Sequence, residues 1–261
     1  MKKEESMFAE VRKQLIVELV NKSAKVTVNQ LCEEFSVSPA TIRNDLRELE
    51  DGGFLKRTHG GAISNRKVTY EPNAYQKEVE NVAEKKAIAR RAFAHIEKGD
   101  SIALDTGTTT FELAKLLVDC DDLTVVTNDL QIAAYLECNS NVNIIMAGGL
   151  VRRNFHCTAG KAAVDTIQDL NVDKAFIAAN GVHLKKGLCT PHMDTARVKS
   201  VFTDSASQVV LMADSTKIGN SSFVTFAQLS DIDVFITDEN ADKDFLSVVE
   251  KMDIDIEIAK K

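Results

Sequence analysis

The stretch 27–61 constrains the fold of this chain more than any other part of the sequence. Within it, residues 28–35 place apolar side chains at i, i+3, i+4 and i+7, which predicts a short helix with one buried face. Thr27 comes just before this helix and Gln30 follows three residues later. This is the spacing of a capping box, in which each side chain binds an otherwise unpaired backbone N–H. We therefore expect a helix to begin directly after Thr27.

A second helix is predicted to begin at Pro39, because Ser38 is a good N-cap and the fixed φ angle of proline suits the first helical position. Its inward residues are expected to be Ile42, Leu46 and Leu49. The polar side chains that point away from this face are Thr41, Arg43, Asn44 and Arg47. Two helices joined by a tight turn, the second carrying such side chains, suit the major groove of DNA. The alternative is a small helical domain with solvated charges.

The sequence on both sides of this helix pair favours the DNA-binding interpretation. Upstream, an amphipathic helix that completes a three-helix core has its apolar side chains at Phe8, Val11, Leu15, Leu19 and Val20. Downstream of Gly52 and Gly53, residues 54–59 predict a strand that turns at Gly60 and Gly61 into a second strand, which together form a wing. The wing residues expected to contact the DNA backbone or the minor groove are Lys56, Arg57, His59 and Gly60.

Charge is distributed unevenly along the 261 residues. The formal net charge is −7, but residues 1–66 carry 11 Lys or Arg and 10 Asp or Glu, a net +1, which leaves −8 for the remainder. An acidic body weakens nonspecific binding to DNA phosphates, so the N-terminal part must place its few cations well. The sequence has neither an apolar run long enough to cross a membrane nor a signal-peptide pattern, so we expect a cytoplasmic protein with no membrane partner.

Residues 83–261 alternate short β-rich runs with helical runs, after a stretch at 64–82 without a clear period. A helix is expected from Glu84 to Ile96. Strands are expected at 101–104, 124–127, 143–147, 175–179, 208–213 and 234–237. Helices are expected at 110–118, 130–136, 163–170, 195–206 and 241–251. This alternation predicts an α/β domain with a mostly parallel sheet and helices on both faces. The expected organisation is a DNA-binding domain at 1–63, a linker at 64–82 and a second domain at 83–261.

Small and polar residues follow five of the predicted strands. Because parallel sheets bind ligands beyond the carboxyl ends of their strands, these residues are expected to converge on one rim. They are Asp105, Gly107, Thr108, Thr109, Thr110, Thr127, Asn128, Gly148, Gly149, Asn180, Gly181, Asp214 and Lys217. Glycine lets a backbone approach an anion, and hydroxyls and helix N-termini donate hydrogen bonds to it. Each turn alone could merely cap a helix, but together they predict a site for a polar ligand with a phosphate group.

No cofactor or metal motif accompanies this rim. The sequence lacks the GxGxxG fingerprint of dinucleotide-binding folds and the GKS or GKT of a P-loop. Its five cysteines include no CxxC pair, so neither a disulfide framework nor a zinc site is supported. Cys189 and His192 have a ligand-like spacing, but such lone residues are more often structural. We therefore expect no cofactor, no metal and no catalytic residue.

The segment TIRNDLRELEDGGFLKRTHGGA resembles the winged helix-turn-helix of the DeoR family of bacterial regulators of sugar metabolism. The segments LDTGTTTFELAKLL, LTVVTNDLQIA, AGG, NGVHLKKGLCT and ADSTKIG are similar to the sensor domain of that family, which is similar in fold to ribose-5-phosphate isomerase. The resemblance implies a repressor of a carbohydrate uptake or catabolism operon that a phosphorylated sugar releases from its operator. It also implies that the DTGTTT loop holds the phosphate, with Asp214 and Lys217 beside the sugar. Asn44 departs from the family, which usually has a second arginine after Arg43.

Three functions each account for some of these features. A sugar-phosphate isomerase-like enzyme needs a general base, for which Asp105, Asp129 and Asp214 are available, but its DNA-binding domain is hard to explain. A purely architectural DNA-binding protein leaves the polar rim unexplained. The combination favours a transcription regulator that is not an enzyme. Its expected partners are double-stranded operator DNA, a phosphorylated sugar effector and itself, as a homodimer or homotetramer, since a palindromic operator needs two helix-turn-helix units.

Overall fold

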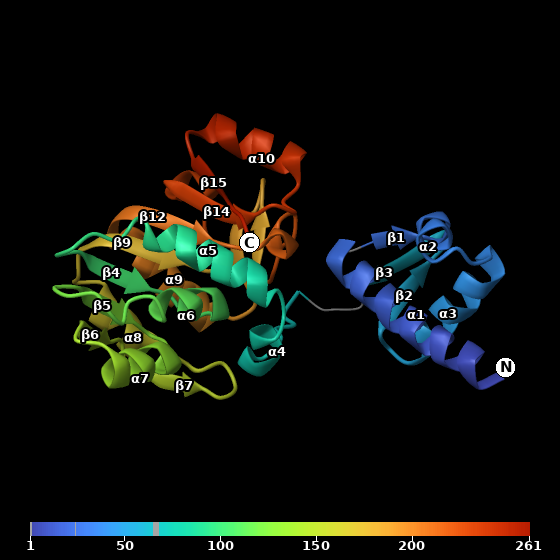
Figure 1. The fold of residues 1–261 in the computed structure, drawn as a ribbon, viewed down its shortest axis with the longest axis horizontal. Helices are drawn as coiled ribbons and strands as arrows, with labels where there is room; N and C mark the ends of the chain where they lie inside the picture. The colour runs from blue at the N-terminus through green and yellow to red at the C-terminus, as the bar shows by residue number, and fades with distance from the viewer. Residues whose placement is uncertain (1, 24, 65–67) are drawn as a thin grey trace. The chain divides into compact units, whose positions relative to one another are not determined.

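The structure, a computed structural model, describes residues 2–23, 25–64 and 68–261. The chain divides into two compact units, residues 1–70 and 71–261, which are blue and teal-to-red in Figure 1. This division differs from the expected linker at 64–82, because residues 71–82 already belong to the second unit. Residues 65–67 of the expected linker lie outside the described residues.

The N-terminal unit contains three helices and a small sheet. Its elements are α1 (Lys2–Ser23), β1 (Lys25–Thr27), α2 (Val28–Phe35), α3 (Pro39–Asp51), β2 (Leu55–Thr58) and β3 (Gly61–Ser64). The strands pair antiparallel in the order β1-β3-β2. The buried apolar core includes Ile16, Val20, Val26, Leu31, Ile42, Leu46, Leu49, Leu55 and Ala62. The predicted helix pair and wing are confirmed, whereas β1, which joins the wing sheet, was not predicted.

The buried face of α1 differs from the prediction. Val11 and Leu15 are 50% and 41% exposed, whereas Ile16 and Val20 are fully buried. Successive residues of a helix are about 100° apart, so Leu15 and Ile16 cannot both point at the core, and Ile16 takes the central position. The side chain of Phe8, also expected on this face, lies outside the described residues.

The C-terminal unit is built around a seven-stranded sheet. Its strands are β4 (Ser101–Leu104), β5 (Thr124–Thr127), β6 (Asn143–Met146), β9 (Val172–Ile177), β12 (Ala206–Met212), β14 (Val234–Asp238) and β15 (Asp255–Ala259). The order is β15-β14-β12-β9-β4-β5-β6, and every neighbouring pair is parallel. The predicted α/β fold and six of these strands are confirmed. The edge strand β15 was not predicted.

Helices cover both faces of this sheet (Figure 1). They are α5 (Val82–Phe93), α6 (Thr108–Ala114), α7 (Leu130–Asn139), α8 (Lys161–Ile167), α9 (Met193–Asp204) and α10 (Lys243–Val249). Along β4, Ile102 and Leu104 belong to one buried cluster with side chains of α5, α6 and α7. Ala103 belongs to the other, with side chains of α8, α9 and α10. Strand β4 is therefore apolar on both faces, as expected for a strand inside a covered parallel sheet.

Smaller elements complete the unit around the large sheet. They are α4 (Ala74–Glu78), the hairpin β7 (Leu150–Arg152) and β8 (Cys157–Ala159), the antiparallel sheet β10 (Gly181–His183), β11 (Gly187–Thr190) and β13 (Val224–Ala227), and three short 3-10 helices at Ser215–Lys217, Leu229–Asp231 and Glu250–Met252. Asn73 and Gln76 form a capping box on α4. The N–H of Ala74 donates to the carbonyl of Asn154, 2.8 Å away, so α4 is fixed to the loop of the β7–β8 hairpin.

Candidate nucleic-acid interface and ligand pocket

The helix pair of the N-terminal unit is capped as its sequence predicts. The Thr27 side chain accepts from the N–H of Gln30 at 3.2 Å, and the Gln30 side chain accepts from the N–H of Thr27 at 2.8 Å. Ser36 ends α2 in the left-handed region, with φ of 53°. The Ser38 hydroxyl accepts from the N–H of Thr41 at 3.2 Å, and Pro39 occupies the first turn of α3. These caps set the tight turn between the two helices.

The outward face of α3 carries the side chains expected to contact DNA bases. Arg43, Asn44 and Arg47 are exposed, and Arg47 Nη1 donates to Asn44 Oδ1 at 3.4 Å. On the opposite side, Asp45 is 95% buried, and its carboxylate accepts two hydrogen bonds from Arg12 of α1. The hydrogen bonds to Asp45 raise the pKa of Arg12, which stays a cation. This pair, which was not predicted, orients α3 against α1.

The wing consists of the β2–β3 hairpin. A Cβ at Gly61 would lie 1.9 Å from the carbonyl oxygen of Val26, so only glycine lets β3 approach β1 at this point. Lys56 and His59 are exposed. The Arg57 guanidinium, half-buried, lies 3.9 Å from the carboxylate of Glu50, so the wing presents one exposed lysine and one arginine that already has an acidic neighbour.

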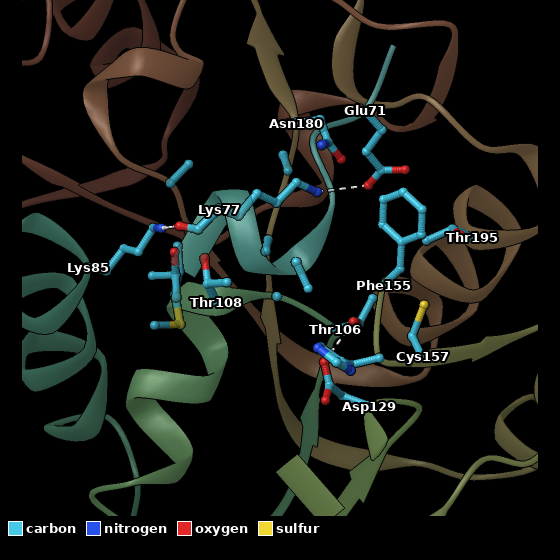
Figure 2. Close-up of a pocket in the computed structure, with 18 of the residues that line it drawn as sticks. Glu71, Lys77, Lys85, Thr106, Thr108, Asp129, Phe155, Cys157, Asn180 and Thr195 are labelled. Atoms are coloured by element: carbon cyan, nitrogen blue, oxygen red, sulfur yellow. Dashed lines mark hydrogen bonds and ion pairs between the residues drawn. The ribbon is translucent and has the colours of Figure 1, made fainter. Parts of the chain in front are cut away.

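A pocket in the C-terminal unit lies at the carboxyl ends of the central strands (Figure 2). The loop after β4 contributes Thr106, Gly107, Thr108 and Thr109. The turns after β9 and β12 contribute Ala178, Ala179, Asn180, Ala213, Asp214 and Lys217. Asp129 follows β5, and its Oδ2 accepts from the Thr106 hydroxyl at 2.7 Å, which joins two neighbouring strand ends. This is the position at which parallel α/β sheets bind ligands.

The structure brings six of the predicted ligand-binding residues to the pocket wall. They are Gly107, Thr108, Thr109, Asn180, Asp214 and Lys217. The predicted residues that do not line it are Asp105, Thr110, Thr127, Asn128, Gly148, Gly149 and Gly181.

Three of the polar side chains that do not line the pocket donate hydrogen bonds to backbone carbonyls instead. The Thr110 and Thr127 hydroxyls donate to the carbonyls of Asp105 and Leu104, both at 2.7 Å, and the Asn128 amide donates to a carbonyl of β8 at 2.9 Å. At Gly149, φ is +135° and a Cβ would lie 2.7 Å from a carbonyl of β8, so close approach of two chain segments explains this glycine.

Asp105 forms a buried ion pair with Lys199 of α9. Both side chains are almost fully buried, and Lys199 also donates to the carbonyl of Ala178 at 2.9 Å. Burial raises the pKa of Asp105, and Lys199 opposes that rise. Asp105 was predicted to face the ligand, but its carboxylate is directed at a side chain that comes 94 residues later.

Several charged residues of the pocket were not predicted. Lys77 of α4, Lys85 of α5 and Arg152 of β7 line it, together with Glu71 and Phe155. Figure 2 shows Lys77 pointing toward Glu71 and Lys85 directed at the carbonyl of Lys77. Glu71 and Lys77 belong to the stretch interpreted as a linker, and Lys85 belongs to a predicted helix. Arg152 and Phe155 belong to a hairpin that was not predicted. The position of a residue after a strand could therefore identify none of them.

The pocket disfavours the charged form of two lysines, Lys77 and Lys85. Burial lowers the pKa of Lys85 to about 8, although the Asp214 carboxylate opposes this shift. Burial also lowers the pKa of Lys77, and Glu71 only partly offsets it. An anion that enters the pocket stabilises the protonated form of each lysine. The pocket is therefore suited to a negatively charged ligand.

The sequence matches two family models, one in each unit. Residues 12–68 match the DeoR-like helix-turn-helix domain, and residues 80–239 match the DeoR C terminal sensor domain. The chain belongs to the DeoR family. It is thus a DNA-binding transcriptional regulator. The exposed face of α3 lies in the first matched region and most of the pocket in the second, whereas Glu71, Ala74 and Lys77 of the pocket lie between the two.

Relatives in this family align with nearly the whole chain. The HTH-type transcriptional regulator GlpR of Haloferax volcanii is 39% identical over 96% of this chain and 98% of its own. The transcriptional repressor AccR of Agrobacterium fabrum is 36% identical over 92% of this chain and 94% of its own. Among solved structures, ribose 5-phosphate isomerase A of Methanocaldococcus jannaschii aligns with 53% of this chain and 55% of its own, at 15% identity and a TM-score of 0.40. That degree of likeness says nothing about activity.

Within residues 2–23, 25–64 and 68–261, no helix is both long enough and apolar enough to span a membrane. Within the same residues, no three His, Cys, Asp or Glu side chains come together in a group that could hold a metal ion.

Proposed function

We propose that this DeoR-family protein represses an operon for carbohydrate uptake or catabolism and that a phosphorylated sugar releases it from its operator. The observation that carries the proposal is the presence, in one chain, of an exposed Arg–Asn–Arg face on α3 and a pocket that combines threonine hydroxyls with lysines. DNA recognition needs the first, and recognition of a phosphorylated polyol needs the second.

The pocket offers suitable partners to both parts of a sugar phosphate. Thr108 and Thr109 supply hydroxyls, and Lys85 and Lys217 supply cations for phosphate oxygens. Asp214 Oδ2 lies 3.5 Å from Lys217 Nζ and can accept from a sugar hydroxyl. A carboxylate that orients hydroxyls beside donors that bind phosphate is the combination expected for this ligand class.

Release of DNA follows from linkage. We expect the C-terminal unit to drive assembly into a homodimer or homotetramer. A sugar phosphate that binds one arrangement of this homo-oligomer more tightly shifts the population toward it. Coupling energies between two such sites are typically about 1–3 kcal/mol. Repression then depends on whether the favoured arrangement fits the two halves of a palindromic operator.

The isomerase alternative would use Asp129 as a general base, because burial raises its pKa. However, Asp129 Oδ1 accepts from the N–H groups of Gln131 and Ile132, at 2.8 and 3.0 Å, and its Oδ2 accepts from Thr106. A carboxylate that caps a helix with one oxygen and binds a neighbour with the other is poorly placed to take a proton from a substrate. This arrangement supports a binding function.

The proposal is tested with a DNA fragment that the full-length protein selects from a random pool. Release of this fragment is titrated with pentose and hexose phosphates and with the matching unphosphorylated sugars. Release by a phosphorylated sugar, but not by its parent sugar, is the expected result. No release by any phosphate would contradict the proposal, and interconversion of a sugar phosphate without DNA release would favour the isomerase.

A further inference from the structure

The carboxylate of Glu71 lies between two cations of the pocket. Its Oε1 is 2.8 Å from Lys77 Nζ, and its Oε2 is 3.0 Å from Arg152 Nη2. The exposed fractions of the three side chains are 9% for Glu71, 12% for Arg152 and 26% for Lys77. Burial alone would raise the pKa of Glu71, but the two cations bring it below its usual value, so this carboxylate is an anion.

The two cations are held by more than Glu71. Arg152 Nη1 donates to the Thr195 hydroxyl at 3.0 Å, and the guanidinium carbon lies 4.1 Å from the centre of the Phe155 ring. Lys77 Nζ lies 5.8 Å from the same ring. An arginine stacked on an aromatic ring keeps its donors fixed in direction. Lys77 and Arg152 therefore form a preorganised pair of donors for one oxyanion, beside Phe155.

We infer that Lys77 and Arg152 form an anion subsite that Glu71 occupies in the ligand-free protein, and that an anionic oxygen group of the effector displaces Glu71 from it. This inference rests on the proposed ligand-binding function of the pocket, which is lined by Glu71, Lys77, Arg152 and Phe155. The group that enters this subsite is a phosphate or a carboxylate. The subsite is distinct from the phosphate position expected at Thr108 and Lys217.

Displacement follows from charge. A phosphate group carries about −1.5 to −2 at neutral pH and offers three acceptor oxygens, whereas Glu71 offers one negative charge. Two buried donors that bind both anions at once would bring like charges together, which is unfavourable. The incoming group therefore takes the donors and Glu71 leaves them.

The position of Glu71 in the chain gives this exchange a consequence. Glu71 is the first residue of the C-terminal unit, and the chain before it leads directly to the DNA-binding unit. Once displaced, Glu71 no longer ties this start of the unit to the pocket. The following helix α4 keeps its hydrogen bond from Ala74 to Asn154 and the edge-to-face contact of Tyr75 with His156. The subsite thus links ligand binding to the segment that joins the two units.

Inorganic phosphate is the probe for the first test, by calorimetry on the full-length protein without DNA. Glu71→Gln removes the competing charge but keeps the shape of the side chain. It should bind phosphate about tenfold more tightly than the unchanged protein, since charged hydrogen bonds contribute about 1.5–3 kcal/mol and 1.4 kcal/mol is a factor of ten. The control is Glu80→Gln, which removes the same charge from an exposed side chain at the same pocket.

No gain in Glu71→Gln, or an equal gain in Glu80→Gln, would overturn the inference. A parallel titration with acetate distinguishes the two ligand classes: a gain for phosphate alone assigns a phosphate group, and a gain for acetate assigns a carboxylate. Either gain supports the subsite. Phosphate binding without DNA can succeed even if no sugar phosphate releases the operator, so failure of the proposed function remains distinguishable.

A second measurement uses the unchanged protein, in case Glu71→Gln does not fold. Amide hydrogen exchange is followed in a peptide that spans residues 68–73, with and without saturating inorganic phosphate. Displacement of Glu71 should speed exchange of the Glu71 amide and its neighbours by severalfold, because the ion pairs of Glu71 no longer hold this segment to the pocket. Unchanged or slower exchange would mean that phosphate binds without moving Glu71, and the inference would fall.

Discussion

The guanidinium of Arg12 and the carboxylate of Asp45 connect α1 to α3 through two hydrogen bonds, Nε to Oδ2 at 2.7 Å and Nη2 to Oδ1 at 3.1 Å. Asp45 lies on the inner side of the helix whose outer side is expected to contact DNA. We expect Asp45→Ala to destabilise the DNA-binding unit by about 2 kcal/mol, because it leaves Arg12 without its partner. Thermal unfolding of the full-length protein measures this. Glu48→Ala, which removes an exposed partner of Lys13, should change little, and an equal loss in both variants would contradict the prediction.

Arg43 and Arg47 are expected to contact bases. Replacing either with alanine should cost about 1–3 kcal/mol of operator binding and relax the base preference at one operator position. A shift assay against the selected operator and its single-base variants measures both effects. The control is Lys161→Ala, which removes an exposed cation from the other unit. Unchanged affinity in both arginine variants would exclude α3 as the base-contacting helix.

The wing is expected to contact phosphates without sequence preference. Lys56→Ala and Arg57→Ala should weaken binding to all sequences alike and reduce the slope of log affinity against log salt by about one. Because Arg57 already lies near Glu50, its loss should have the smaller effect. Binding isotherms at several salt concentrations give the slopes. A selective loss on one sequence, with the slope unchanged, would place the residue among the base contacts instead.

The phosphate of the effector is expected beside Thr108. Thr108→Glu puts a carboxylate at that position, so operator release by the effector should be lost while operator binding persists, since the DNA-binding unit has its own core. Lys217→Ala should weaken the effector response less. Gln168→Glu adds the same charge at an exposed residue of the same unit and serves as the control. Release of the Thr108→Glu protein at ordinary effector concentrations would show that the ligand does not contact this loop.

Lys85 should make stability depend on alkaline pH. Its pKa is lowered by burial to about 8 in the folded state, whereas the ordinary value is 10.5, so the unfolded chain binds more protons between these two pH values. The free energy of unfolding therefore rises with pH in this window. Relative to Lys85→Met, the unchanged protein should gain about 3 kcal/mol between pH 8 and 10.5. Calorimetry across this range, with exposed Lys86→Met as control, tests it. Parallel curves for the Lys85→Met and unchanged proteins would refute it.

Local patterns accounted for most of the fold. The capping box of Thr27 and Gln30 and the proline at 39 act within a few residues, so their sequence spacing is sufficient to place α2 and α3. The inner strands of the large sheet are largely buried, and helical periods separate the strands along the chain, which made six of them recognisable. Strand β15 lies at a sheet edge, where Ala259 is the only buried residue of the strand, and it carries a weaker signal.

The pocket was less predictable because it depends on contacts between distant segments. Position after a strand identified Thr108, Asn180 and Asp214, which line the pocket. The position of a residue after a strand could not show that the Asp105 carboxylate faces Lys199, because the direction of a side chain there depends on the residues that pack around it. Glu71 belongs to a stretch without periodicity, and its role depends on Arg152, in strand β7 of a hairpin far along the chain.

The position of β4 in the sheet has a consequence for how the protein is made. β4 is the first strand of the large sheet to leave the ribosome, yet its neighbours are β9 and β5, and β9 emerges much later. Ala103 is fully buried in the finished sheet in a cluster with side chains of α9 and α10, which follow β9 in the chain. A growing chain therefore leaves one edge of β4 unpaired and its Ala103 face incompletely covered while it waits for β9. The DNA-binding unit contains only its own early residues and can fold during that wait. We expect this interval to be the one in which the nascent chain aggregates or recruits a chaperone, and ribosome-bound chains that end before β9 should show it as chaperone binding that is lost once β12 has emerged.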